Sequence, residues 1–277
     1  MWNKFMNLGA SMKFFTQSML GTSSPSPLVQ YSMLIDTTKC TGCRICDVAC
    51  KLENELPAEE RPSGIETRPI IPGLTSTSFT IVKSVPGVKG PVFIKLQCNQ
   101  CEGPACASVC PAKSAITKEY EGGSVTAIDI TKCFGCKYCI VACPFHIPQR
   151  DPEGKTATKC TFCESRLARG LKPACYEACP MGAIKFGDKE KIRDFAIERA
   201  KEIDGYIYGL KEADGSNILT ILPTQPGELG LPEVDEKSYT SFATLRRVLV
   251  EGSGIIIFIL ASVAFVLLIM LMLGVMK

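Results

Sequence analysis

The chain has 277 residues, enough for one large domain or two small ones, and its 46% hydrophobic and 21% charged residues indicate a globular protein with an additional, more apolar segment. The formal net charge of +3 is too small to indicate a nucleic-acid-binding surface. The chain has 16 cysteines. Disulfide scaffolds this rich in cysteine are short and do not repeat a CxxC spacing, so we interpret the cysteines as metal ligands.

The first predicted element is an N-terminal arm over residues 1–30, with scattered apolar residues, two lysines and a turn-rich end, GTSSPSP. It has no long apolar core and no paired arginines, so neither a secretory nor a twin-arginine signal is indicated. We expect a surface arm that packs on a partner.

The first cysteine quartet, TKCTGCRICDVAC, follows a short apolar strand predicted at 31–36, YSMLID. Its cysteines are Cys40, Cys43, Cys46 and Cys50. Gly42 allows the loop to turn tightly, so that backbone amides can point at cluster sulfurs, and ICDVACKLENEL predicts a helix. Lys51 stands where this type of run usually has a proline, which is not a ligand.

A loop-rich connection is predicted between Leu56 and Gly90, around one strand-like run, Phe79 to Val85. A strand at 92–97, VFIKLQ, then leads into the second quartet, in which four residues separate the second and third cysteines. Its members are Cys98, Cys101, Cys106 and Cys110. The sequence AITKEYEGGSVTAIDI predicts a hairpin that turns at Gly122 and Gly123.

The third quartet, KCFGCKYCIVACP, has the CxxCxxCxxxCP spacing of bacterial ferredoxins, with Cys133, Cys136, Cys139 and Cys143. In that run three cysteines hold one 4Fe-4S cluster and the fourth reaches a neighbouring cluster, so a second cluster is predicted close by. We interpret His146 as a polar loop residue near the cluster, because one histidine cannot supply a bis-histidine haem.

The fourth quartet, KCTFCESRLARGLKPACYEACP, departs from the short ferredoxin pattern because eleven residues separate its two cysteine pairs. Its members are Cys160, Cys163, Cys175 and Cys179. Taken alone, it is compatible with a structural zinc site of the CxxC…CxxxC type. Beside three iron-sulfur quartets, a fourth cluster is the favoured interpretation.

Past Gly187 the sequence DKEKIRDFAIERAKEID predicts an amphipathic helix that packs on the cluster domain, with Asp188 as its N-cap. Its apolar residues recur at helical spacing and are Ile192, Phe195, Ala196, Ala200 and Ile203. The Pro- and Gly-containing segment Asp214 to Pro232 is interpreted as a linker or as a strap around a partner.

The last predicted element is a transmembrane helix over Gly254 to Met276. These 23 residues carry no charge and would span about 34 Å at about 1.5 Å per residue. A long buried core helix is the alternative. Arg246 and Arg247 precede the helix and Lys277 follows it. By the positive-inside rule the two arginines favour a cytoplasmic cluster domain.

Thiolates are soft ligands that suit iron-sulfur clusters, and the 16 cysteines fill four 4Fe-4S clusters with none left over. An open iron is therefore not indicated, which favours electron transfer over catalysis in this chain. Ferredoxin topology further predicts that the first quartet pairs with the fourth, and the second with the third. The predicted ligand sets are Cys40, Cys43, Cys46 and Cys179 for cluster a; Cys98, Cys101, Cys106 and Cys143 for cluster b; Cys133, Cys136, Cys139 and Cys110 for cluster c; and Cys160, Cys163, Cys175 and Cys50 for cluster d.

Several basic residues stand near the quartets in the sequence, namely Arg44, Lys95, Lys137 and Arg166. A nearby positive charge raises the reduction potential of a cluster. We interpret each of these four, taken singly, as a solvated or partner-facing charge.

The four motifs, in this order and spacing over about Leu34 to Lys185, resemble the four-cluster iron-sulfur (beta) subunit of molybdopterin oxidoreductases. The nitrate reductase branch has a tryptophan at one ligand of the third quartet, whereas here all four positions are cysteine. With its C-terminal helix, the chain looks most like the membrane-bound formate dehydrogenase iron-sulfur subunit.

This resemblance implies a molybdenum- or tungsten-pterin catalytic subunit and a quinone-reactive cytochrome b subunit as partners, in the inner membrane. It also implies a cluster domain on the outer, periplasmic face, against the arginine count. The equivalent subunit of a hydrogenase or another respiratory oxidoreductase, and a freestanding membrane-tethered polyferredoxin, are the alternatives.

The predicted fold is α+β, with two nested ferredoxin-like modules that hold two clusters each and a C-terminal transmembrane helix. The predicted division is an arm at 1–30, a four-cluster domain at 31–187, a helix and partner-binding linker at 188–245, and a membrane anchor at 246–277.

Overall fold

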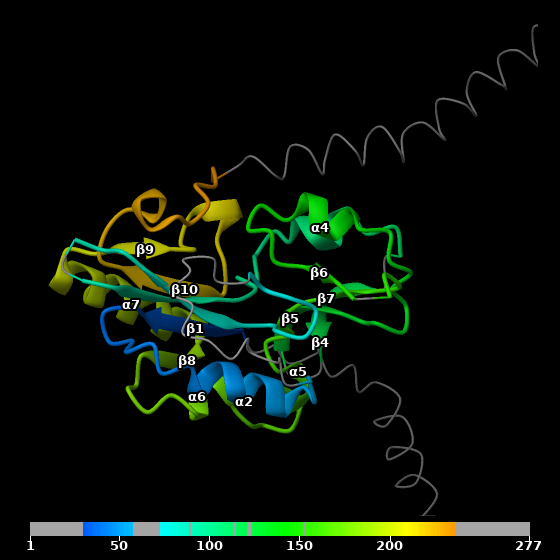
Figure 1. The fold of residues 1–277 in the computed structure, drawn as a ribbon, viewed down its shortest axis with the longest axis horizontal. Helices are drawn as coiled ribbons and strands as arrows, with labels where there is room; N and C mark the ends of the chain where they lie inside the picture. Colours follow the sequence, from blue (N-terminus) through cyan, green and yellow to red (C-terminus); the bar gives the residue numbers. More distant parts are fainter. Residues whose placement is uncertain are drawn as a thin grey trace, which may run out of the picture.

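The computed structural model describes residues 30–57, 73–88, 90–112, 115–120, 123–151 and 153–236. Figure 1 shows β9, β10, β1 and β8 in the left half of the molecule, α2 and α6 below them, and α4 with β6 and β7 at the right. Helices and separate small sheets alternate along the chain, so the α+β prediction is confirmed.

A four-stranded sheet in the order β8-β1-β10-β9 is the largest regular element of the described residues. β1 (Tyr31–Asp36) pairs antiparallel with β8 (Ile184–Asp188) and parallel with β10 (Ile218–Leu222), and β9 (Tyr206–Tyr208) pairs antiparallel with β10. The two central strands thus come from opposite ends of the described chain.

The segment Asp214 to Pro232 is not a linker or strap over its whole length, and that prediction is wrong for β10. All five β10 residues are buried, and the strand runs beside β1 with Met33 opposite Ile218. A strand covered on both faces reads as an uninterrupted apolar run, here ILTIL, and carries no alternation to mark it. The domain boundary predicted after Gly187 stays a prediction. Strand β10, which lies beyond this boundary, joins the sheet of β1, which lies before it.

Helix α7 (Lys189–Ile203) covers one face of the sheet, as its apolar spacing predicts. The Asp188 carboxylate accepts a hydrogen bond from the Lys191 backbone N–H at 3.3 Å, which confirms the predicted N-cap. Ile192 and Ala196 pack against Leu34 and Leu219 of the sheet. Alternate residues of β1 point to the opposite face, where Met33 and Ile35 pack with cysteines 46 and 175.

Three two-stranded ribbons support the cysteine loops. They are β2 (Ile81–Val85) with β3 (Val92–Leu96), β4 (Ile116–Tyr120) with β5 (Gly123–Ile128), and β6 (Gln149–Arg150) with β7 (Ala157–Thr158). The second ribbon is the predicted hairpin. The strand predicted from Phe79 begins two residues later, at Ile81.

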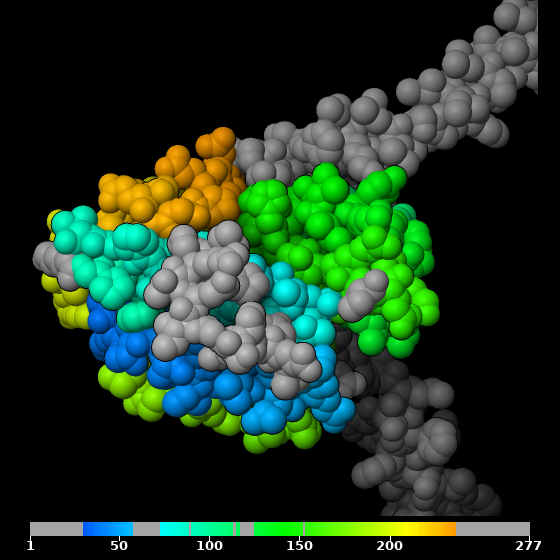
Figure 2. Space-filling view, in the orientation of Figure 1, coloured from blue at the N-terminus to red at the C-terminus, as the bar shows by residue number. Residues whose placement is uncertain are grey.

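Five short helices carry or follow cysteines: α2 (Ile45–Glu53), α3 (Ala105–Ser108), α4 (Tyr138–Ala142), α5 (Glu164–Ala168) and α6 (Ala174–Glu177). Two 3-10 turns, η1 (Glu212–Asp214) and η2 (Pro226–Leu229), flank β10. Helix α2 packs on α6 and α3 packs on α4. Figure 2 accordingly shows the blue segment around residues 30–57 lying against yellow-green chain from the fourth quartet.

The N-terminal arm at 1–29 and the transmembrane helix predicted at 254–276 lie outside the described residues. In the part of the chain that the structure does describe, no helix has the length and hydropathy needed to cross a membrane.

Candidate metal centres

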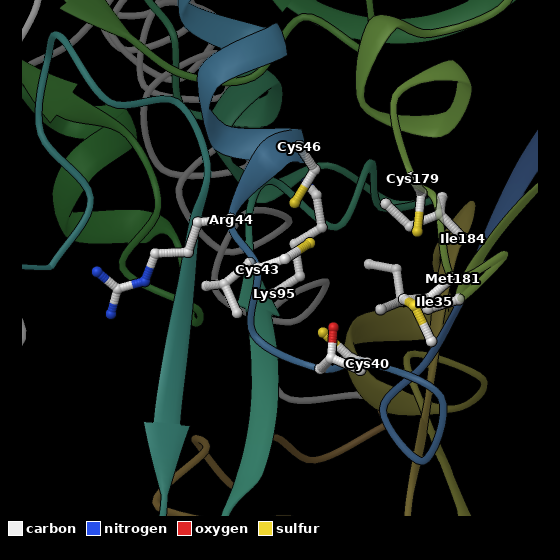
Figure 3. A pocket seen from close by; sticks show the side chains of 12 residues that line it. Ile35, Cys40, Cys43, Arg44, Cys46, Lys95, Cys179, Met181 and Ile184 are labelled. Carbon is white, nitrogen blue, oxygen red and sulfur yellow. The ribbon is translucent and has the colours of Figure 1, made fainter.

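A cavity between β1, β3 and the start of α2 brings together cysteines from the two ends of the cluster region. Its lining includes Cys40, Cys43, Cys46 and Cys179, with Lys95 beside them. Figure 3 shows the four cysteine side chains directed toward a common space, while Arg44 points away from it. These four cysteines are the set predicted for cluster a.

The remaining cysteine of the first quartet, Cys50, lies one helical turn beyond Cys46 on α2. Its thiol interacts electrostatically with Cys175, and those of Cys160 and Cys163 interact with Cys50 in turn. The packing of α2 on α6 produces this approach, because Cys175 is the second residue of α6. These four cysteines are the set predicted for cluster d.

The second and third quartets are interleaved in the same way. A second cavity is lined by Cys98, Cys101, Cys106 and Cys143, together with Lys159. The thiol of Cys139 interacts electrostatically with the three remaining members of its predicted set, which are Cys133, Cys136 and Cys110. The packing of α3 on α4 brings these two quartets together.

Electrostatic interactions between cysteines of different groups indicate the order of the groups. Cys46 of the first group interacts with Cys175, and Cys160 interacts with Cys98. Cys106 in turn interacts with Cys139. The groups therefore follow one another in the order a, d, b, c.

Each quartet has a residue with left-handed backbone immediately before its second cysteine. These residues are Gly42 (φ 72°), Gln100 (φ 52°), Gly135 (φ 73°) and Phe162 (φ 59°). This conformation turns amides toward the sulfurs: the Phe162 N–H donates to Cys160 Sγ at 3.4 Å, and the Gly42 N–H donates to Cys40. Amide hydrogen bonds to ligand sulfurs are a known determinant of cluster potential. Sequence analysis identified Gly42 and could not identify Gln100 or Phe162, because glutamine and phenylalanine rarely adopt this conformation.

Burial makes several of the cysteine thiols poor acids. It raises the pKa of Cys46 and Cys163 to about 12, and that of Cys50 to about 11. Neighbouring thiols add to this rise, since two thiolates repel each other. A strongly positive metal core that four thiolates share removes both costs, so the donor sets suit iron-sulfur clusters.

The described cysteines are not joined by disulfides. Within the same residues, no three His, Cys, Asp or Glu side chains gather closely enough to hold a single metal ion.

The basic residues near the quartets differ in their surroundings. Lys137 is exposed, in agreement with its interpretation as a solvated charge. Arg166 is largely covered and pairs with Glu53 at 2.7 Å and Glu177 at 2.6 Å. The interpretation is wrong for Lys95, which is buried and lines the first cavity. Burial lowers the pKa of Lys95, but the charges of the surrounding cysteines outweigh it and raise this pKa.

Lys159 is a second buried lysine, and sequence analysis did not single it out. Its ammonium donates to Cys98 Sγ at 3.4 Å and to the Cys160 carbonyl at 3.2 Å. The tripeptide Thr-Lys-Cys occurs at three quartets and gives no sign of which lysine is buried. His146, by contrast, is an exposed loop residue, as predicted.

Comparison with known proteins gives a consistent result. Residues 91–189 match the family model for the 4Fe-4S dicluster domain. The chain is 38% identical over 167 residues to the thiosulfate reductase electron transfer subunit PhsB of Salmonella typhi, a match that covers 59% of this chain and 80% of the relative.

The chain is also 35% identical over 225 residues to the formate dehydrogenase-O iron-sulfur subunit of Escherichia coli (strain K12), covering 76% of this chain and 74% of the relative. A protein of Nitratidesulfovibrio vulgaris is 39% identical over 198 residues, which cover 67% of this chain. The chain spans about half (52%) of the length of that relative.

Proposed function

Because this chain belongs to the family of iron-sulfur electron-transfer subunits that includes those of formate dehydrogenase and thiosulfate reductase, we propose that it carries electrons between a catalytic subunit and a membrane subunit. Its cofactors are four 4Fe-4S clusters. When bound, each cluster accepts and releases one electron. The chain's own residues hold the clusters, keep water from the inner ones and donate hydrogen bonds to their sulfurs.

We assign the ligands as the four sets a to d named above, in which quartets exchange their fourth cysteines. The single observation that carries the proposal is the interleaving of four thiol groups in one series. Each group borders the next, so an electron that enters at one end has a continuous path to the other.

Cysteine substitutions test the assignment. In the assembled complex, Cys50→Ala is expected to abolish the same EPR signal as Cys175→Ala, because both belong to cluster d. Cys43→Ala is expected to abolish a different signal, that of cluster a. The assignment fails if Cys50→Ala and Cys43→Ala remove the same signal.

Exposed apolar side chains gather at the two ends of the series. Cluster a has Ile45, beside its ligand Cys46, and Met181, which lines its cavity. The third-quartet loop, which supplies three cluster c ligands, has Phe134, Tyr138 and Val141. Apolar side chains grouped on a surface in this way are typical of protein interfaces. We infer that one end docks the catalytic subunit and the other a quinone-reactive subunit of cytochrome b type.

For the catalytic partner we propose a molybdenum- or tungsten-pterin formate dehydrogenase. The equivalent subunit of a hydrogenase or another respiratory oxidoreductase is the second candidate. We further propose that residues 254–276 anchor the chain in the inner membrane, with the cluster domain on the periplasmic face.

Purification of the native complex in mild detergent tests the partners. The proposal expects co-purification with a pterin-containing large subunit and formate-dependent reduction of a quinone. Hydrogen-dependent reduction instead would support the second candidate. Recovery of the chain as a stable monomer would contradict the proposal and support a freestanding polyferredoxin.

A further inference from the structure

Two lysine side chains are buried between the cysteine groups. Lys95 on β3 is 4% exposed, and Lys159, immediately after β7, is 3% exposed. The Lys95 ammonium donates to Thr80 Oγ1 at 2.6 Å and to Gln97 Oε1. The Lys159 ammonium donates to the Thr126 carbonyl, in addition to Cys98 and Cys160. The hydrogen-bond acceptors named for both ammonium groups therefore lie in the interior.

Among the described residues, neither ammonium is within ion-pair distance of a carboxylate. The Asp47 carboxylate interacts electrostatically with Lys95 but is itself partly buried and accepts the Val82 N–H at 3.0 Å. A buried cation without an anionic partner is strongly unfavourable, so both sites call for a negative group.

The cysteine groups supply that negative charge, and each lysine faces two of them. Lys95 lines the cavity of the cluster a ligands and interacts electrostatically with Cys175 and Cys50 of the cluster d set. Lys159 contacts Cys98 of the cluster b set and the backbone of Cys160, a cluster d ligand. Lys95 thus lies between a and d, and Lys159 lies between d and b.

We propose that Lys95 and Lys159 are fixed internal cations that raise the reduction potentials of the clusters beside them, most of all that of cluster d, which faces both. This inference rests on the proposed function and on its ligand sets. A cluster held by four thiolates is anionic, and reduction adds a further negative charge. An ammonium in the poorly polarisable interior stabilises the reduced form more than a solvated ammonium does.

Two other lysines in the chain occupy the same sequence position as Lys159 relative to a quartet and serve as controls for the effect of that position. Lys39, Lys132 and Lys159 each precede the first cysteine of a quartet in the same tripeptide, Thr-Lys-Cys. Lys39 is exposed, and the Lys132 side chain is 53% exposed and pairs with Asp129 at 2.9 Å. Burial, and not adjacency to a ligand, therefore distinguishes Lys159.

An EPR-monitored redox titration of the intact complex tests the proposal, with Lys95→Met, Lys159→Met and the control Lys132→Met. Lys95→Met is expected to lower the potentials of clusters a and d, and Lys159→Met those of clusters d and b. Each reduction equilibrium should change at least tenfold, which corresponds to about 59 mV for one electron. The potential of cluster c should be unchanged in both variants. Lys132→Met should leave all four potentials unchanged.

Lys159→Arg keeps the charge and is expected to retain most of the wild-type potential. If a methionine variant fails to assemble four clusters, the glutamine variants Lys95→Gln and Lys159→Gln replace it. The proposal is overturned if variants that retain all four clusters keep their wild-type potentials, or if arginine and methionine at position 159 shift them equally. If the wild-type complex transfers electrons through this chain but the lysine variants keep the wild-type potentials, only the role of the lysines is rejected. A wild-type complex without electron transfer through this chain would reject the proposed function itself.

Discussion

The outer cysteine loops of the series, at the first and third quartets, differ in construction from the inner loops at the second and fourth. In the outer loops the left-handed residue before the second cysteine is a glycine, Gly42 or Gly135. In the inner loops it is Gln100 or Phe162, each 1% exposed. Glycine adopts this conformation without strain, whereas the other two are held in it by their buried side chains.

The loops also start their helices differently. In each inner loop a Pro-Ala-Cys sequence begins a four-residue helix, α3 or α6, and places the third cysteine at its second position. In each outer loop a left-handed basic residue, Arg44 or Lys137, precedes α2 or α4. At the position before the second cysteine, the inner loops thus contribute a side chain to the core, and the outer loops do not. This difference fits our proposal that partner subunits dock at the ends of the series.

Removal of an inner aromatic side chain is expected to have the largest effect. Phe162→Ala should lower the free energy of unfolding by about 3–5 kcal/mol, because Phe162 is buried and packs edge-on against Phe186 with ring centroids 5.8 Å apart. Phe134→Ala in an outer loop, where the ring is 63% exposed, should change it by less than about 0.5 kcal/mol. Denaturant unfolding of the cluster-loaded protein measures both, and equal losses would remove the distinction between the loops.

A side chain added in an outer loop is expected to be the next most costly change. Gly135→Ala should destabilise by at least about 1–2 kcal/mol, because alanine is strained in this conformation. Its Cβ would also lie 2.6 Å from the Lys155 carbonyl oxygen and 2.7 Å from that of Gly154.

Gly42→Ala is the matched variant for this prediction. The three atoms nearest to its Cβ would all belong to the ring of Phe93, and a side chain moves aside more readily than backbone. Iron retention during thermal unfolding should therefore fall further for Gly135→Ala than for Gly42→Ala, and the reverse order would contradict this explanation.

Arg166 links α2 of an outer loop to α5 and α6 of an inner loop. It lies on α5 and pairs with Glu53 on α2 and with Glu177 on α6. Arg166→Met should lower the free energy of unfolding by about 1 kcal/mol. Arg169→Met is the control, because Arg169 is more exposed and lies 3.7 Å from the same Glu53. Denaturation at low and high salt measures both, and a larger loss for Arg169→Met would exclude the proposed connection.

Alkaline pH is expected to lower the free energy of unfolding slightly. Tyr206, which packs against the core that contains Cys98 and Cys143, donates its hydroxyl to Glu212 Oε1 at 2.6 Å. Burial and this carboxylate raise the pKa of Tyr206 from 10.0 to about 12. Because the pKa is raised in the folded state, the stabilisation from the protonated Tyr206 hydroxyl is complete below pH 10. It is lost as the pH rises through 12. Tyr206→Phe should flatten this part of the stability profile, and an unchanged profile would contradict the assignment.

Sequence reasoning identified the elements whose residues carry their own local signal. The cap at Asp188 and the hairpin after the second quartet follow from turn chemistry. The exchange of fourth cysteines, which we propose, follows from the spacing of the quartets. Strand β10 lacked such a signal, because its burial depends on pairing with β1. The two strands are far apart in the chain: Ser32 of β1 and Asn217, just before β10, are separated by 185 residues. The positions of Lys95 and Lys159 were likewise not predictable, because their burial depends on how the quartets pack.

The central claim is that four clusters lie in series in this chain, and low-temperature EPR during a redox titration of the purified complex tests it most directly. The account predicts four 4Fe-4S centres with magnetic interaction between neighbours and no three-iron signal in the oxidised protein. Fewer than four centres, a three-iron signal, or four centres without interaction would contradict it.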